Sequence, residues 1–443
     1  MGSPGCGGRI GPCCRWAGAG LGRLAGRVRF GRFRIGLCVV LCAGLSAGRS
    51  PGADRGVAAP PGWLRGDAPK LAYRIDESKQ NTGIGSAQRI VVRAEALIGM
   101  DERVEVLIVG GGPGGLACAA DLAAGGARVL LVERKPAIGP KVCAGGITWN
   151  GLIREVPETL IEAAFPEQHI VTGRQRTVVA EENPIVATVN RERLGQWMAQ
   201  QAATAGADLR TGCRVLRLDS GSATLEDGAG RQTRVTFDFL VGADGSNSLV
   251  RRSLGLPARA VGLGLNAMLP GHLPRMEWHL RADLFGCGYG WVFPHAEEVS
   301  VGAYTAASGL SGRVLKERLL AWAATQGMRI EPDAVRAGLV NFDYRGVRFD
   351  RTFLVGDAAG LASGLTGEGI HPALISGRAV ARMILDPAAS TRALDLLVHH
   401  HRRHRRFVAL AGGRRRLCGL LMETLVVLLR LKMLDFRALE MAR

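Results

Sequence analysis

A short run of glycines near residue 110 has the spacing of a phosphate-binding loop. Gly110, Gly112 and Gly115 form a Gly-x-Gly-x-x-Gly pattern directly after the apolar segment Val104–Val109. The first glycine permits a tight turn, the second lets the backbone approach a pyrophosphate, and the third lets a helix pack closely on a strand. Glu133 lies about 20 residues further on, where an acidic side chain accepts hydrogen bonds from ribose hydroxyls. These residue types predict a dinucleotide-binding site.

The segments around this loop have the order that such a site needs. Val104–Val109 is predicted to be a strand, Leu116–Ala124 a helix, and Ala127–Val132 a second strand that leads into Glu133. A helix that begins at the loop presents free N–H groups and the positive end of its dipole to the phosphates. A glycine motif alone is a weak signal, but strand, loop, helix and acid together are specific.

Two further motifs follow the fingerprint in a characteristic order. An apolar segment leads into Asp244-Gly245, and another leads into Gly356-Asp357. With the fingerprint they resemble the FAD-dependent group that includes the aromatic hydroxylases and the geranylgeranyl reductases. The resemblance covers roughly residues 104–392.

The resemblance implies roles for several residues in binding FAD. In that group the acid at Asp357 binds the ribityl chain, and Asp244 and Gly245 also contribute to cofactor binding. The segment that contains Gly367 and Gly369 would point a helix N-terminus at the flavin. Arg191 resembles an arginine that recurs in the group, which implies a contact with FAD or with a diphosphate.

The same resemblance implies an α/β fold. A Rossmann-like FAD-binding domain with a ββα sandwich is expected to be interleaved with an antiparallel substrate sheet and followed by a helical C-terminus. The expected divisions are a leader over 1–99, the FAD-binding domain over 100–150, 188–256 and 345–392, the substrate domain over 151–187 and 257–344, and a basic helical C-terminus over 393–443.

Three segments resemble the geranylgeranyl reductase family in particular. They are Lys141–Gly146, Gly288–Pro294 and Leu365–Ile370. The sequence departs from the family pattern at Ala144, where glycine is usual, and at Gly364, where proline is common. It departs again at His295, where the family usually has lysine. The implied reaction is the saturation of alkene bonds in a prenyl chain.

That chemistry suits the residue types in these segments. Saturating an alkene needs a hydride on one carbon and a proton on the other. Cys143 is the first candidate for delivering the proton or shaping the site, although it is also compatible with a small buried core residue. His371 is the second candidate for delivering the proton. Tyr289 and Trp291 are equally compatible with lining an apolar pocket and with packing a sheet face, whereas Phe293 is expected to pack.

Other functions of the same fold stay open on sequence alone. One is an FAD-dependent monooxygenase of an apolar or aromatic substrate, and another is a non-enzymatic escort that binds prenyl chains. Only one Gly-x-Gly-x-x-Gly fingerprint is present, so NAD(P)H or another electron donor would reach the flavin without a second nucleotide domain. No zinc-like cluster of Cys and His occurs, and no metal is expected.

Basic charge is concentrated at the two ends of the 443-residue chain. Lys and Arg number 57 against 39 Asp and Glu, and the whole excess lies in residues 1–99 and 399–443. The neutral body argues against nucleic acid as a partner. The first segment is interpreted as a disordered leader or an over-extended start before Met100, with a targeting peptide as the alternative.

The C-terminal segment admits two interpretations. The apolar run Leu417–Leu434, beside clusters of arginine, is expected to be a terminal helix packed on the protein's own core, with contact at a membrane surface as the alternative. His399–His401 and His404 are expected on the solvated basic face. Isolated cysteines in the body favour a reducing compartment. The expected location is the cytoplasm, and peripheral contact with a membrane is compatible with it. No oligomeric state is predicted.

Overall fold

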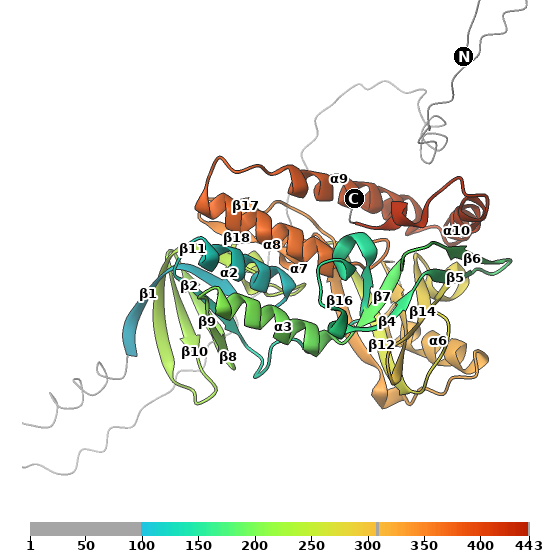
Figure 1. Ribbon diagram of the computed structural model, residues 1–443, viewed down its shortest axis with the longest axis horizontal. Helices are drawn as coiled ribbons and strands as arrows, with labels where there is room; N and C mark the ends of the chain where they lie inside the picture. Colours follow the sequence, from blue (N-terminus) through green and yellow to red (C-terminus); the bar gives the residue numbers. More distant parts are fainter. Residues whose placement is uncertain (1–98, 307–309, 442–443) are drawn as a thin grey trace, which may run out of the picture. The chain divides into compact units, whose positions relative to one another are not determined.

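A computed structural model describes residues 99–306 and 310–441, and its strands form three sheets (Figure 1). The leader interpretation of residues 1–99 lies outside the described residues apart from Gly99. The predicted fold class is confirmed, because a mostly parallel sheet, an antiparallel sheet and a helical C-terminus are all present. The division into the ranges given above stays a prediction.

The first sheet carries the nucleotide-binding motifs at one edge. Its main path runs β17 (Arg348–Phe349), β18 (Thr352–Leu354), β11 (Gln232–Gly242), β1 (Gly99–Val109), β2 (Val129–Glu133) and β8 (Asp208–Thr211), with β10 (Ser222–Glu226) and β9 (Arg214–Asp219) beside β11. Strands β18, β11, β1, β2 and β8 are parallel. Their carboxyl ends therefore meet at one edge, where open α/β sheets bind ligands.

Helices cover this sheet and explain the composition of its central strand. They include α2 (Pro113–Ala124), α3 (Arg191–Thr204), α4 (Leu249–Ser253), α7 (Gly356–Ala359) and α8 (Ile370–Leu385). Helix α2 packs against both α3 and α8 (Figure 1). Val106, Leu107 and Ile108 of β1 are fully buried, which explains the near-continuous apolar run. Helix α2 begins three residues earlier than predicted because Pro113 suits the first turn of a helix.

The second sheet separates two apolar cores. Its order is β16 (Arg336–Asn341), β12 (Val261–Pro270), β15 (Glu298–Thr305), β14 (Gly288–Pro294), β13 (Glu277–His279), β5 (Glu167–Val171) and β6 (Arg176–Ala180). Side chains alternate along β14, so Tyr289, Trp291 and Phe293 share one face. Val292 faces the other core, with α6 (Gly312–Thr325).

A small third sheet and several short helices connect the two larger ones. The sheet contains β3 (Gly146–Thr148), β7 (Val186–Val189) and β4 (Ile161–Phe165). The short helices are η1 (Trp149–Ile153), η2 (Glu158–Leu160), α5 (Ala282–Phe285), η3 (Pro332–Ala334) and η4 (Phe436–Leu439). Strand β3 follows Lys141–Gly146 directly, so this sheet holds the segment that contains Cys143.

Two helices follow α8. They are α9 (Arg392–Ala411), which packs on α8, and α10 (Arg415–Arg430), which packs beside β6 (Figure 1) and on α5. Helix α10 buries Cys418, Met422, Val426 and Leu429 in the same core as the aromatic face of β14. The expectation of a terminal helix packed on the protein's own core is confirmed. None of the helices in the described ranges is long and apolar enough to cross a membrane.

The expectation for the histidines of α9 was largely wrong. His400, His401 and His404 are buried, and only His399 is exposed. The helical period places residues 397, 400, 401, 404 and 408 on one face, and that face packs inward. Burial lowers the pKa of His401 to about 4 and that of His404 to about 3, so both are neutral at physiological pH.

Candidate functional site

The glycine loop after β1 has the backbone that a phosphate cradle requires. Gly110 has a φ of +111°, and a side chain there would collide with the backbone carbonyl of Ala243. A side chain at Gly115 would collide with the carbonyl of Gly110. Helix α2 starts inside this loop, with Gly112 as its N-cap. The amide groups of its first turn therefore point into the space where an anion would lie.

Glu133 lies against the same loop. Its carboxylate accepts hydrogen bonds from the backbone N–H of Gly111 at 2.8 Å and of Lys135 at 2.9 Å. These contacts fix the carboxylate at the end of β2, beside the glycines. The predicted association of Glu133 with Gly110, Gly112 and Gly115 is therefore present in the structure.

Asp244 follows β11 and also adjoins the loop. One carboxylate oxygen accepts the N–H of Leu249 at 2.5 Å and of Val250 at 3.3 Å, and so caps α4. The other oxygen, Oδ1, is buried and has no hydrogen-bond partner among the described residues. Burial raises the pKa of this carboxyl above its usual range. Gly245 has a φ of +80°, which turns the chain away after Asp244.

Asp357 joins three of the predicted motifs. Its carboxylate Oδ2 accepts the Lys141 ammonium at 3.2 Å and the Ser246 hydroxyl at 3.0 Å. The side chain of Asp357 is only 9% exposed, whereas that of Lys141 is 50% exposed. The segment 141–146, the Asp-Gly turn and the Gly-Asp turn therefore meet at one carboxylate. Gly369 lies beside it, since a side chain there would come within 3.2 Å of Asp357 Oδ1.

Arg191 presents hydrogen-bond donors that the described residues leave unused. It begins α3, directly after Asn190, whose side chain caps the helix. Its Nε and Nη1 atoms are buried without a hydrogen-bond partner in the described part of the chain. Buried guanidinium donors in proteins normally have partners. Arg191 is therefore suited to an oxygen-rich ligand.

Cys143 lies in a turn held by both neighbouring sheets. The N–H of Gly145 donates to its sulfur at 3.4 Å, and the amide of Asn266 on β12 donates to its backbone carbonyl at 3.4 Å. Asn266 accepts the hydroxyl of Ser300 at 2.7 Å, and Ser300 accepts the indole N–H of Trp291 at 3.0 Å. A chain of buried hydrogen bonds thus joins Trp291 to the Cys143 turn. Cys143 is half-buried, while the other described cysteines are buried.

Aromatic rings gather on the face of the second sheet that carries Trp291. The Tyr289 and Trp291 rings lie 6.0 Å apart, and Trp278 lies 5.3 Å from Tyr289 and 4.7 Å from Phe293. Trp291 and Phe293 are buried, whereas Tyr289 is half-buried. The Tyr289 hydroxyl donates to the carbonyl of Thr366 at 2.5 Å. This bond ties the aromatic face to the segment that contains Gly367 and Gly369.

The segment 363–371 also contains a carboxyl group that sequence reasoning did not select. Glu368 accepts the N–H of Met441 at 2.9 Å, and burial raises the pKa of its carboxyl to about 7. His371 follows in the first turn of α8. Glu368 stands inside the segment that resembles the reductase family, and an acid among glycines and apolar residues was the signal that could have identified it.

The C-terminal helices hold this segment from a second side. Ser363 shares a 2.8 Å hydrogen bond with the Nδ1 atom of His404 on α9. The Ser363 hydroxyl also accepts the N–H of Leu365 at 3.2 Å and of Thr366 at 3.0 Å. Sequence reasoning also missed this role for His404, because its partner is 41 residues away along the chain.

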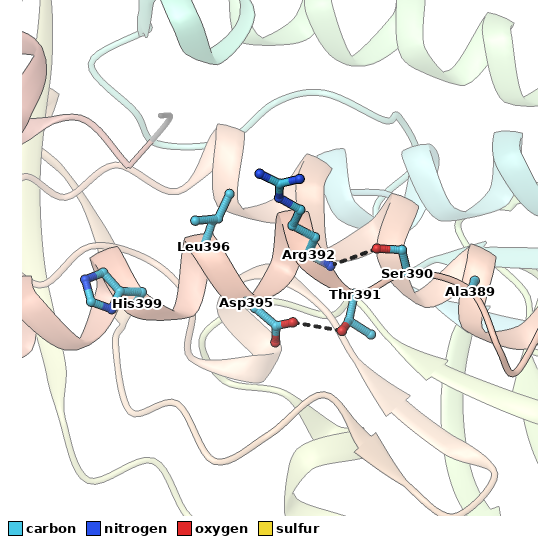
Figure 2. A pocket seen from close by; sticks show the side chains of 7 residues that line it. All are labelled: Ala389, Ser390, Thr391, Arg392, Asp395, Leu396 and His399. Atoms are coloured by element: carbon cyan, nitrogen blue, oxygen red, sulfur yellow. Dashed lines mark hydrogen bonds between the residues drawn. The ribbon is translucent and has the colours of Figure 1, made fainter.

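A surface depression lies at the start of α9, away from these motifs. Figure 2 shows its lining, in which Thr391 donates to Asp395 at 2.8 Å and the N–H of Arg392 donates to Ser390 at 3.4 Å. None of the predicted site residues contributes to it. The motif residues instead gather at the carboxyl edge of the first sheet and on the facing side of the second.

Known proteins share both the sequence pattern and this fold. A family model described as an FAD binding domain matches residues 103–268. The digeranylgeranylglycerophospholipid reductase 2 of Methanothermobacter thermautotrophicus is 30% identical over 297 residues, which cover 61% of this chain and 74% of that protein. The chain belongs to the geranylgeranyl reductase family. A geranylgeranyl diphosphate reductase of Rhodobacter capsulatus is 29% identical over 312 residues, which cover 66% of this chain and 78% of that protein.

Among solved structures, this fold is similar to that of a geranylgeranyl bacteriochlorophyll reductase-like protein from Thermoplasma acidophilum. The TM-score is 0.59 at 22% sequence identity, with 73% of this chain and 88% of that chain covered. The chain is thus an FAD-dependent oxidoreductase of the geranylgeranyl reductase type.

The residues present fit FAD. A Cβ added at Gly112 would meet no atom nearer than 3.9 Å, so the second glycine of the loop leaves space in which a ligand can approach the backbone. The unpartnered donors of Arg191 and the unpartnered Oδ1 of Asp244 are buried polar atoms of the kind that a bound cofactor satisfies. The individual roles of the selected residues remain predictions, although the structure brings most of them to one edge of the first sheet and the adjoining face of the second.

Proposed function

We propose that this protein saturates alkene bonds of a geranylgeranyl-type prenyl chain that lies beside Tyr289, the half-buried ring on the aromatic face of the second sheet. One observation carries the proposal. The Tyr289 hydroxyl contacts Thr366 at 2.5 Å, so the aromatic face directly adjoins the segment 363–371 next to Asp357. The Cys143 turn is joined to that same face through Asn266. An apolar chain on this surface would therefore lie beside the cofactor-binding motifs.

The chain's own residues would hold the cofactor as follows. The glycine loop and the N-terminus of α2 bind the pyrophosphate, and Glu133 binds the adenosine ribose. Asp357, with Lys141 and Ser246 on the same oxygen, binds the ribityl chain. Bound FAD, once reduced, supplies the hydride for one alkene carbon. We propose NAD(P)H or another electron donor as the reductant that reaches it.

A side chain near the aromatic face would deliver the proton to the second alkene carbon. We propose Cys143 for this role, because it is half-buried in a turn that both sheets hold in place. His371 is the second candidate. Glu368 is a third group that can hold a proton near neutral pH, since burial raises its pKa to about 7. A proton donor works best when its pKa lies near the working pH.

We also propose contact with a membrane surface, where a prenyl lipid would be found. Both ends of α10 expose basic and apolar side chains. The exposed residues are Arg414, Arg415, Arg416 and Leu420 at its start, and Arg430, Leu431, Lys432 and Met433 at its end and in the turn after it. Apolar side chains beside basic ones suit the interface of an anionic bilayer. The proposed location is the cytoplasm and the periphery of a membrane, and the described cysteines are free thiols.

An anaerobic reoxidation assay tests the proposal. The full-length holoprotein is reduced with dithionite, geranylgeranyl diphosphate or a geranylgeranyl glycerolipid is added, and the return of oxidised-flavin absorbance is followed. The expected result is reoxidation without oxygen. Reoxidation that occurs only when air is admitted, with oxygen found in the product, would replace the reductase by a monooxygenase. A purified chain that binds no flavin would favour a prenyl-binding escort.

A further inference from the structure

A histidine and a glutamate meet behind the Cys143 turn, and neither belongs to the roles assigned above. The Nδ1 atom of His295 lies 2.6 Å from a carboxylate oxygen of Glu162, and its Nε2 atom lies 3.0 Å from the carbonyl oxygen of Ala144. The side chains are 7% and 14% exposed. His295 is the residue after Pro294, where the reductase family usually has lysine.

The backbone of β4 is distorted at the residue that provides the carboxylate. The pairing of β4 with β7 shifts register between Ile161 and Ala163, so Glu162 is the extra residue of a β-bulge. Bulges redirect a side chain and are common beside active sites.

Both ring nitrogens of His295 face acceptors, which determines where the hydrogens are. The carbonyl of Ala144 can only accept, so Nε2 must carry a hydrogen and donate it. The 2.6 Å contact of Nδ1 with Glu162 then needs a second hydrogen between these two atoms. The Ala144 carbonyl therefore receives a hydrogen bond from an imidazole whose other nitrogen is held by Glu162.

The imidazole also packs directly on the turn. Gly145 has a φ of +79°, and a Cβ there would come within 2.5 Å of His295 Cε1 and 2.8 Å of the Val189 carbonyl. The N–H of Val189 in turn donates to the Gly145 carbonyl at 3.0 Å. Space and hydrogen bonds together leave the peptide after Ala144 a single orientation.

Two separate side-chain systems thus hold two consecutive carbonyls. Asn266 donates to the carbonyl of Cys143, and His295 donates to that of Ala144. The next N–H, that of Gly145, donates to the Cys143 sulfur. Rotation of the peptide between Ala144 and Gly145 would move both the carbonyl that His295 binds and the N–H that contacts the sulfur.

We propose that Glu162 and His295 are positioning residues that fix the Cys143 thiol in its orientation toward the substrate. The inference rests on the proposed function, because it deepens the role assigned there to Cys143. Glu162 orients the imidazole, and the imidazole holds the Ala144 carbonyl. A lysine at position 295 could make the same two contacts, since an ammonium group donates to a carbonyl and to a carboxylate.

The test uses full-length holoprotein with Glu162→Ala, Glu162→Gln, His295→Ala and His295→Lys. The first readout is the rate at which iodoacetamide alkylates Cys143 in the oxidised protein, followed by peptide mass spectrometry. The second is the single-turnover rate and the substrate dependence of anaerobic alkene reduction. Glu277→Ala is a matched control, because Glu277 contacts the buried His279 at 2.9 Å in a second His–Glu pair, which lies beside Trp322 and not beside the turn.

The expected result is a change of about fivefold or more in Cys143 alkylation for both alanine variants, the size expected when a hydrogen bond worth about 1 kcal/mol is lost. The reduction rate should fall by about tenfold, with little change in the substrate concentration needed for half-saturation. FAD content and the Glu277→Ala control should match the wild type, and His295→Lys should recover most of the rate. Glu162→Gln should fall between wild type and Glu162→Ala, because the amide keeps a hydrogen bond but not the charge.

Unchanged alkylation and unchanged reduction in both alanine variants would overturn the proposal. So would a His295→Lys variant as slow as His295→Ala. If the alanine variants do not fold, Glu162→Gln and His295→Lys decide by the same two readouts. A wild-type protein that reduces no prenyl chain would contradict the proposed function, whereas the alkylation rates would still report whether the pair positions the thiol.

Discussion

At the glycine-loop end of the site the chain uses its own backbone, whereas at the substrate end it uses side chains from distant parts of the sequence. The glycine-loop end comprises residues 110–115 with Glu133. Its contacts are made by backbone amides, and its backbone segments pack closely because the glycines have no Cβ. The substrate end comprises residues 141–146, 289–295 and 363–371. There the contacts are Tyr289 to Thr366, His295 to Ala144, and His404 to Ser363.

The difference determines how each end responds to substitution. A backbone cradle fails when an atom is added, because there is no space for it. A site held by distant side chains fails when a functional group is removed, because each contact orients one element against another. Variants of the glycine-loop end should therefore lose FAD, whereas variants of the substrate end should keep FAD and reduce the alkene more slowly.

The largest expected effect on cofactor binding is the loss of FAD in Gly115→Ala. The new methyl group would collide with the carbonyl of Gly110 and lie 3.0 Å from the Cβ of Ala243. Overpacking of this kind costs about 1–3 kcal/mol, which would weaken FAD binding by about tenfold to a hundredfold. FAD content per chain, measured by absorbance, checks the prediction. Gly228→Ala is the control, since its nearest atom would lie 3.9 Å away; equal FAD content in both variants would contradict the account.

The largest expected effect on the rate of alkene reduction belongs to Cys143→Ala, which should keep its FAD. Loss of a proton donor typically lowers a rate by about 100-fold or more. Single-turnover reoxidation of the reduced protein by a prenyl substrate measures this rate. Cys213→Ala removes a buried thiol elsewhere and should leave the rate unchanged. A wild-type rate in Cys143→Ala would show that Cys143 is a packing residue and does not deliver the proton.

A separate effect concerns the pH dependence of stability, which depends on the carboxyl of Glu368. Its pKa is raised by burial from 4.5 to about 7, so the folded state holds a proton that the unfolded state releases between these values. Its contribution to stability is full below about pH 4.5 and is lost as the pH rises through about 7. A shift of this size corresponds to about 3 kcal/mol.

Comparison of wild type with Glu368→Gln isolates this contribution. The free energy of unfolding of the wild type should fall more steeply between about pH 5 and pH 8 than that of the variant. Denaturant unfolding of the two holoproteins at several pH values measures the difference. Parallel curves would show that Glu368 ionises as an exposed carboxyl does, and that the substrate end contains no buried acid.

The smallest expected effect belongs to Tyr289→Phe, which removes the hydroxyl that contacts Thr366. Loss of one such hydrogen bond costs about 1 kcal/mol, or about fivefold in a rate or an affinity. The prediction is a fivefold loss in prenyl reduction with unchanged FAD content. Tyr344→Phe, at a half-buried tyrosine near His401, is the matched control. An equal loss in both variants would contradict a specific role for the Tyr289 hydroxyl.

Sequence alone predicted the glycine-loop end well, because local residue types determine its backbone. Gly110 needs a positive φ, Gly115 needs close contact, and Glu133 ends the next strand; each requirement is visible within a short window. Parallel pairing of β1, β2 and β11 then brings the motifs to one edge. The meeting of Asp357 with Lys141 and Ser246 is a consequence of that topology.

The substrate end was less predictable, because its contacts join residues far apart in the chain. Glu162 meets His295 across 133 residues, and Met441 meets Glu368 across 73. The turn of α9 that buries His404 also could not be placed from sequence, since a run of histidines and arginines suggested a solvated face. Its neutral, buried imidazoles became evident only once the helix was packed.

The stoichiometry of reduction tests the central claim most directly. The reduced holoprotein is titrated anaerobically with geranylgeranyl diphosphate. The hydrogen gained by the prenyl product is measured by mass spectrometry and compared with the amount of flavin reoxidised. The account predicts one alkene bond saturated, with two hydrogen atoms gained, for each flavin reoxidised. Flavin that is reoxidised while the prenyl chain keeps its mass, or that stays reduced until oxygen enters, would contradict it.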